Sequence, residues 1–132
     1  MKHDEFIGRV QHLAQLGSRG DAERATWATF QTLGERLEGG EAKDFASQLP
    51  PVLAAYALSG CPGIGERFSV QEFFRRVSDR EGRDVQQAIQ HARAVVEVLQ
   101  KAISPGEIDD ICAQLPSEYG QLFPSCQKFK CE

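Results

Sequence analysis

Two halves of this sequence repeat each other, and the repeat restricts the fold before composition is considered. When residues 21–57 are aligned with residues 87–123, Gln-Leu-Pro at 48–50 meets a second Gln-Leu-Pro at 114–116. Other identical pairs in the same alignment are Ala22/Ala88, Ala28/Ala94, Leu33/Leu99, Gly40/Gly106, Glu41/Glu107 and Asp44/Asp110. The segment EFIGRV at 5–10 likewise matches EFFRRV at 72–77. Matches that keep their order along the chain indicate duplication of one unit.

Apolar residues recur at intervals of three and four, which is the period of an α-helix. The first half carries Phe6, Val10, Leu13 and Leu16; Ala22, Thr26, Phe30, Leu33 and Leu37; Phe45 and Leu49; and Val52, Leu53 and Tyr56. No long run alternates with the period of a strand, so we expect no sheet. We predict an all-α fold of about eight helices, in two pseudo-equivalent four-helix repeats packed into one bundle-like domain.

The predicted single helical domain spans residues 1–123, with repeat one at 3–58 and repeat two at 69–123. Between the repeats, SGCPGIGERF at 59–68 is rich in glycine and proline, which predicts a loop. A polar C-terminal tail follows at 124–132.

Helix starts in the second half carry capping residues. Ser69 and Ser104 each precede a glutamate by three residues, the spacing of a capping box. Asp84, three residues before Gln87, is a weaker form of the same signal. We therefore expect helices to begin after all three residues.

Composition excludes several classes of protein. The chain of 132 residues has 15 basic and 19 acidic side chains and a net charge of −4, which disfavours nucleic acid as a partner. Its longest apolar stretch, Val52 to Leu58, is far short of the roughly 20 residues that span a bilayer. The N-terminus lacks the apolar core of a signal peptide, so we expect a cytoplasmic protein with no membrane partner.

The four cysteines are Cys61, Cys112, Cys126 and Cys131. Without an export signal, and with enough apolar residues for a core, the chain is expected to keep free thiols. Cys112 lies on a helical apolar face and is interpreted as a small core residue. Cys126 and Cys131 fall in the polar tail, where redox activity is an open question.

The segments DEFIGRV, ERATWATFQTLGERLEGGEAKDFASQLP, ERFSVQEFFRRV, HARAVVEVLQKAISPGEIDDICAQLP and EYGQLF together resemble the prokaryotic domain-of-unknown-function family 2267. The resemblance covers about residues 3 to 123. It implies an all-helical cytoplasmic protein and brings no catalytic or ligand residues with it. The short central loop and the cysteine-bearing tail depart from the family pattern.

Arginines cluster in RRVSDREGR, and four of them are the candidate binding residues: Arg75, Arg76, Arg80 and Arg83. A local excess of positive charge can bind a phosphate or an acidic partner. The same residues, interleaved with Asp79, Glu81 and Asp84, are also typical of a solvated helix face. Both interpretations stay open at this point.

Polar residues matched between the halves have a structural interpretation. Glu5 with Arg9 in the first half, and Glu72 with Arg76 in the second, have the spacing of ion pairs within one helix. Glu41 and Glu107 open helices, where a carboxylate faces the positive end of the dipole. The other two matched pairs are Asp44/Asp110 and Gln48/Gln114, and the glutamines stand before each Leu-Pro break.

The sequence shows no set of residues that points to catalysis or to a cofactor. His3, His12 and His91 are scattered, and the cysteines do not have the spacing of a zinc site, so no metal is expected. The main hypothesis is a non-enzymatic interaction module that binds an unidentified protein or a second copy of itself. The alternative is a binder of a small anionic ligand at the cleft between the repeats, through arginines such as Arg76.

Overall fold

The computed structural model describes residues 1–126, and within them the chain is helical almost throughout. Its seven α-helices are α1 His3–Leu13, α2 Arg19–Arg36, α3 Glu41–Ala46, α4 Pro51–Ala57, α5 Val70–Glu81, α6 Val85–Ala102 and α7 Pro105–Ala113. Two 3-10 helices follow, η1 Ser117–Gln121 and η2 Pro124–Cys126. Among the described residues the extended backbone is limited to one isolated bridge, Glu38 with Ile64. The all-α prediction is confirmed, although the predicted eighth helix is the 3-10 helix η1.

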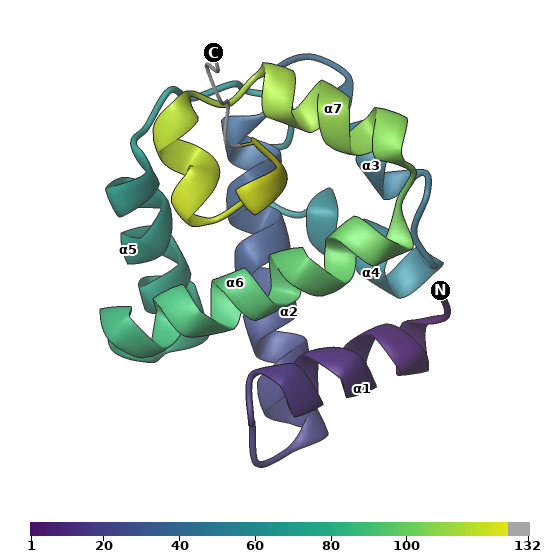
Figure 1. Ribbon diagram of the computed structural model, residues 1–132, viewed down its shortest axis with the longest axis vertical. Coiled ribbons are helices and arrows are strands. Elements are labelled where there is room, and N and C mark those ends of the chain that lie inside the picture. Colours follow the sequence, from purple (N-terminus) through teal and green to yellow (C-terminus); the bar gives the residue numbers. More distant parts are fainter. Residues whose placement is uncertain (127–132) are drawn as a thin grey trace.

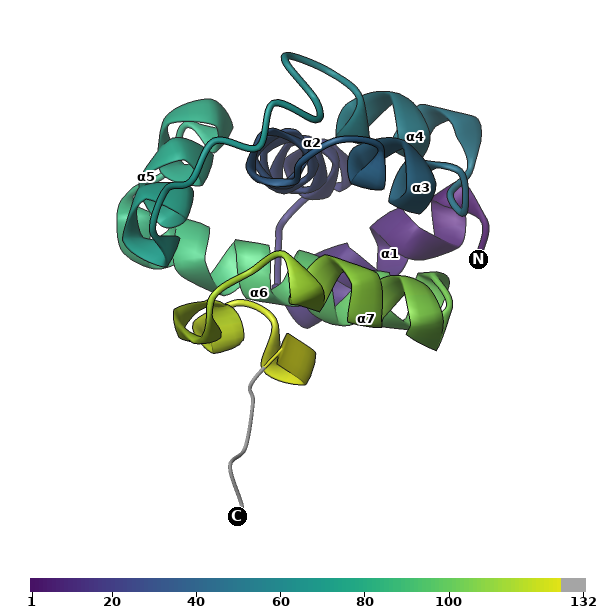
Figure 2. The ribbon, with the colours of Figure 1, turned by 90° about the horizontal axis from the view of Figure 1, so that it is seen from above.

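Helix α2 is the central element, and the other helices are arranged around it (Figure 1). Figure 2 looks nearly along α2, with α5 on one side, α3 and α4 on the other, and α6 on a third. Buried side chains therefore lie on every side of α2. The hydroxyls of Thr26 and Thr32 donate to Ala22 O and Ala28 O, each at 2.8 Å, whereas Thr29 Oγ1 is buried without a hydrogen-bond partner.

The apolar residues of both halves form one continuous core. Phe30 packs edge-on against both Phe6 and Phe45, with ring centroids 5.7 Å apart in each pair. In the second half Phe73 meets Tyr119 edge-on at 5.9 Å. Such contacts favour well-defined core geometry over loose packing.

Gly34 lets helix α4 approach α2 closely, because a Cβ there would lie 2.5 Å from Ala57 O. The predicted loop at 59–68 is confirmed, and its backbone is bonded to the end of α2. Gly63 N–H donates to Gly34 O at 3.0 Å, and Gly65 N–H donates to Leu37 O at 3.1 Å. The loop is thereby held against the central helix.

The predicted capping residues occupy their expected places. Ser69 Oγ accepts from Glu72 N–H at 3.1 Å, Asp84 from Gln87 N–H at 2.9 Å, and Ser104 Oγ from Glu107 N–H at 3.1 Å. Helices α5, α6 and α7 begin directly after these residues. No helix in the described part of the chain combines the length and the apolar character needed to cross a membrane.

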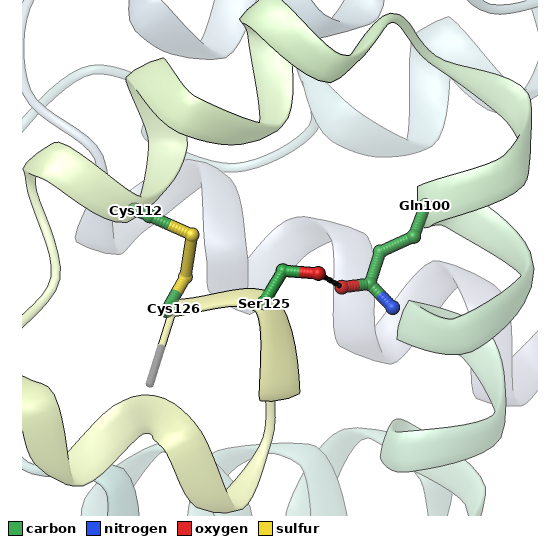
Figure 3. The surroundings of a disulfide bond; sticks show 4 residues. All are labelled: Gln100, Cys112, Ser125 and Cys126. Carbon is green, nitrogen blue, oxygen red and sulfur yellow. Dashed lines mark hydrogen bonds between the residues drawn. A yellow bond between two sulfur atoms is a disulfide. The ribbon is translucent and has the colours of Figure 1, made fainter. Parts of the chain in front are cut away.

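The prediction of free thiols is wrong for Cys112 and Cys126, which form a disulfide (Figure 3). Residues 124–126 are a 3-10 helix, and Cys126 is fully buried against the end of α7. Ser125 Oγ donates to Gln100 Oε1 at 2.5 Å and ties η2 to α6. Nothing in the sequence indicates that residues 124–126 fold back against α7. Cys61 is a free, exposed thiol as expected, and Cys131 lies outside the described residues.

Reduction of the disulfide is expected to lower the free energy of unfolding by about 3 kcal/mol, the entropic effect of closing a loop of about 15 residues. The measurement is urea unfolding with and without a reductant. Cys61→Ser should keep the full response to reductant, and Cys126→Ser should abolish it. Equal midpoints for the oxidised and reduced wild type would contradict this.

Candidate functional site

Arg76, on α5, connects three parts of the chain. Its guanidinium donates to Glu35 on α2 at 3.2 Å, to Glu66 in the loop at 2.6 Å and to Glu72 on its own helix at 2.9 Å. The same group lies over the Phe68 ring, 4.0 Å from the centroid. With three carboxylates and a ring face, its donors are taken up within the chain.

Arg80 reaches the same carboxylate from one turn further along α5. Its guanidinium donates to Glu35 Oε2 at 2.7 Å and to Thr32 Oγ1 at 2.9 Å. The Glu35 side chain is 11% exposed, so its charge is largely removed from water. Two arginines compensate this desolvation, and they seal the contact between α2 and α5.

Arg75 and Arg83 do not contact Glu35. Arg75 binds Glu72 at 2.6 Å and Asp79 at 2.7 Å on the solvent side of α5, and Arg83 contacts Asp21 at 3.3 Å. The structure thus connects three of the four candidate arginines through shared carboxylates, Arg75 and Arg76 through Glu72 and Arg76 and Arg80 through Glu35, and it gives each of the four a carboxylate partner. A binding role for them stays a prediction, and an external anion would have to compete with these carboxylates.

Glu72 shows the strength of this pairing. Hydrogen bonds from Arg75 and Arg76 lower the pKa of its carboxyl to about 2. The predicted ion pair with Arg76 is therefore present, and it belongs to a larger network. The matching pair in α1, Glu5 with Arg9, is also formed, at 2.8 Å.

A hollow of about 420 Å³ lies between α1 and α6, and we call it the α1–α6 hollow. Its lining residues are Glu5, Gly8, Arg9, His12, Leu13, Glu97, Val98 and Lys101. A second hollow, of about 460 Å³, adjoins it and shares Gly8 and His12. Leu13 belongs to a predicted core stripe, yet it is 43% exposed and faces this hollow. Sequence reasoning missed the site, because periodicity alone cannot show which part of an apolar stripe stays uncovered.

Carboxylates also gather where α3 meets α7. Oxygens of Glu41, Glu107 and Asp110 lie within 4.8 Å of one another, and we call these three residues the carboxylate cluster. Burial, with the nearby Glu41 carboxyl as the next cause, raises the pKa of Glu107 to about 8. Glu41/Glu107 and Asp44/Asp110 are matched between the halves, which is the sequence signal that could have revealed the cluster.

One further ionisable pair is buried. Glu81 on α5 contacts His91 Nδ1 on α6, and both residues are almost fully enclosed. Burial raises the pKa of the Glu81 carboxyl, and the His91 partner opposes that rise. The pair lines neither hollow, and it joins α5 to α6.

These features define a small all-helical protein with paired charges at its helix contacts and an open hollow on one side. The chain belongs to the family of uncharacterized conserved proteins DUF2267, which matches residues 3–122. The resemblance noted in the sequence is thereby confirmed. No curated protein matches the chain.

Glu35→Gln is expected to lower the free energy of unfolding by about 2 kcal/mol, because it leaves Arg80 half-buried without a carboxylate and removes one of the partners of Arg76. Urea unfolding at neutral pH measures the change. The matched control is Glu38→Gln, three residues along the chain. The Glu38 side chain is 66% exposed and contacts Arg67 at 3.5 Å, so its loss should stay within about 0.5 kcal/mol. Equal effects of the two substitutions would contradict a central role for Glu35.

The stability of the wild type is expected to fall relative to Glu107→Gln as the pH rises from about 5 to 8. The pKa of Glu107 is raised from 4.5 to about 8 in the folded chain, so in this window the folded state binds more protons than the unfolded state. Urea unfolding in the presence of a chelator, at several pH values, measures the difference. Asp109→Asn, on the exposed side of α7, should follow the wild-type profile. Parallel profiles for wild type and Glu107→Gln would contradict the raised pKa.

Proposed function

We propose that this chain is a non-enzymatic protein-interaction module and that the α1–α6 hollow receives an amphipathic segment of a partner protein. The proposal includes an arrangement of two pseudo-equivalent four-helix repeats. The observation that carries it is a difference between two matching helix contacts: the one between α2 and α5 is sealed by ion pairs, and the one between α1 and α6 is open.

Reciprocal contacts support the arrangement in repeats. Gln48 Oε1 accepts from Ser104 N–H at 2.7 Å, and Gln114 Oε1 accepts from Glu38 N–H at 2.7 Å. In the alignment of the halves, Gln48 corresponds to Gln114 and Glu38 corresponds to Ser104. The glutamine of each half thus accepts a hydrogen bond from the equivalent backbone N–H of the other half, as a pseudo-twofold relation requires.

Under this relation the contact of α1 with α6 corresponds to the contact of α5 with α2. Leu13 takes the place of Arg80, Val98 that of Thr32, and Lys101 that of Glu35. A further change is Gly8, which stands where α5 has Arg75. These replacements remove the ion pairs that seal the second contact and leave an apolar floor at the first.

The charges at the rim favour a protein segment over a small anion. Among the described residues Glu97 and Lys101 have no ion-pair partner, and they lie one turn apart on α6. A partner helix can offer one basic and one acidic side chain to them while its apolar residues cover Leu13 and Val98. At the hollow, Glu5 and Glu97 offset the charges of Arg9 and Lys101, so a small anion would meet no excess of positive charge. At the other contact Arg76 is already held by three carboxylates.

The cytoplasmic location stays a prediction, which cell fractionation tests. The Cys112–Cys126 disulfide is the observation that bears against it, because structural disulfides are rare in a reducing compartment.

Filling the α1–α6 hollow is expected to abolish association with the partner protein. A Cβ at Gly8 meets no atom within 4 Å, so Gly8→Arg can be made without a clash and places a long side chain on the floor of the hollow. A photoreactive phenylalanine at position 13 would capture the partner in the native cell, and calorimetry with the purified partner would give the affinity. Gly8→Arg and Leu13→Asp should each weaken binding at least about tenfold.

Two matched controls should bind like the wild type. Gly106→Arg places the same side chain on another open helical glycine, and Val52→Asp changes a side chain that is 46% exposed, against 43% for Leu13. Unchanged binding by Gly8→Arg would contradict the proposal. A dimer in sedimentation that Gly8→Arg dissociates would replace the partner protein with a second copy of the chain.

A further inference from the structure

We propose that the carboxylate cluster of Glu41, Glu107 and Asp110 is a binding site for a hard divalent cation, placed where α3 meets α7. The three donor atoms come from the first residue of α3 and from two residues one turn apart on α7. Figure 1 shows these two helices beside each other, and they belong to different halves of the chain.

The second observation is that the buried member of the cluster faces another carboxyl group, that of Glu41, and no donor or cation of the described residues. Glu107 is 6% exposed, and its Oε2 atom is closed off from solvent without a hydrogen bond. Glu41 Oε2 is in the same condition. A buried carboxylate without a donor or a cation carries a desolvation cost that protein structures normally compensate. Here the oxygens of both glutamates belong to the group of three, so one bound ion could serve them all.

No cation of the described chain performs this role. Ion pairs within residues 1–126 engage other carboxylates, such as Glu35, Glu66 and Glu72, and none involves the cluster. The charged groups that act on Glu107 are Glu41, Asp44 and Asp110, all acidic.

The donor set and its size indicate the class of ion. All three ligands are carboxylate oxygens, which suit calcium, magnesium or manganese and give no preference for zinc. Calcium–oxygen distances of about 2.4 Å place opposite ligands about 4.8 Å apart. The oxygens of the cluster lie within 4.8 Å of one another, so all three fit in a single coordination shell. Asp110 is exposed, which lets water complete the shell.

The test uses the whole oxidised chain, stripped with a chelator and titrated by calorimetry with Ca²⁺, Mg²⁺ and Mn²⁺ near neutral pH. We expect one ion per chain and a higher Tm in its presence. Glu107→Gln should weaken binding at least about tenfold, and Asp110→Asn should weaken it as well. Asp109→Asn, an exposed carboxylate of the same helix, should bind like the wild type.

Two outcomes would overturn the proposal: no binding of any of the three ions at millimolar concentration, or equal binding by Glu107→Gln and wild type. The first of these would identify the cluster as a pair of glutamates that only share a proton. The α1–α6 hollow contains none of these residues, so this result and the test of the interaction module are independent.

Discussion

Helix α2 is surrounded by other helices along most of its length, and a polar group buried there is costly unless it is hydrogen-bonded. The chain provides partners for several of these groups, although Thr29 Oγ1 is left without one. Thr26 and Thr32 bond to carbonyls of their own helix, Glu35 takes two arginines from α5, and Arg36 donates to Phe68 O at 3.0 Å. The last two contacts also position α5 and the loop before it. The hydrogen bonds and ion pairs of the buried polar groups on α2 therefore fix the position of much of the second half of the chain.

Two buried glutamates show how the surroundings of a carboxylate decide its chemistry. Glu35 accepts hydrogen bonds from two arginines, Arg76 and Arg80, so its charge is compensated within the chain. Glu107 faces other carboxylates and has no base near it, and the pKa of its carboxyl rises to about 8. The first arrangement closes a helix contact. The arrangement around Glu107 leaves negative charge uncompensated, which a proton or a cation can neutralise.

The fold could largely be predicted from local patterns, and the candidate sites could not. Periodicity predicted the helices, and Ser69, Asp84 and Ser104 marked helix starts, because both signals depend on residues close together in the chain. Leu13 was predicted for the core and is partly exposed, because exposure depends on what the neighbouring helix presents to it. The buried Cys126 was taken for part of a polar tail, because only the return of the chain past α7 brings it to Cys112.

By itself, the sequence determined the helical class, the loop at 59–68 and the pairs of residues that match between the halves. These follow from the period of the apolar residues and from the conformational preferences of glycine, proline and capping side chains. Only the tertiary structure decided which of the matched residues have different roles in the two halves. The contact between α2 and α5 is sealed by Glu35 and its arginines, and the contact between α1 and α6 is open beside Leu13, because a contact between helices is set by the side chains of both partners at once.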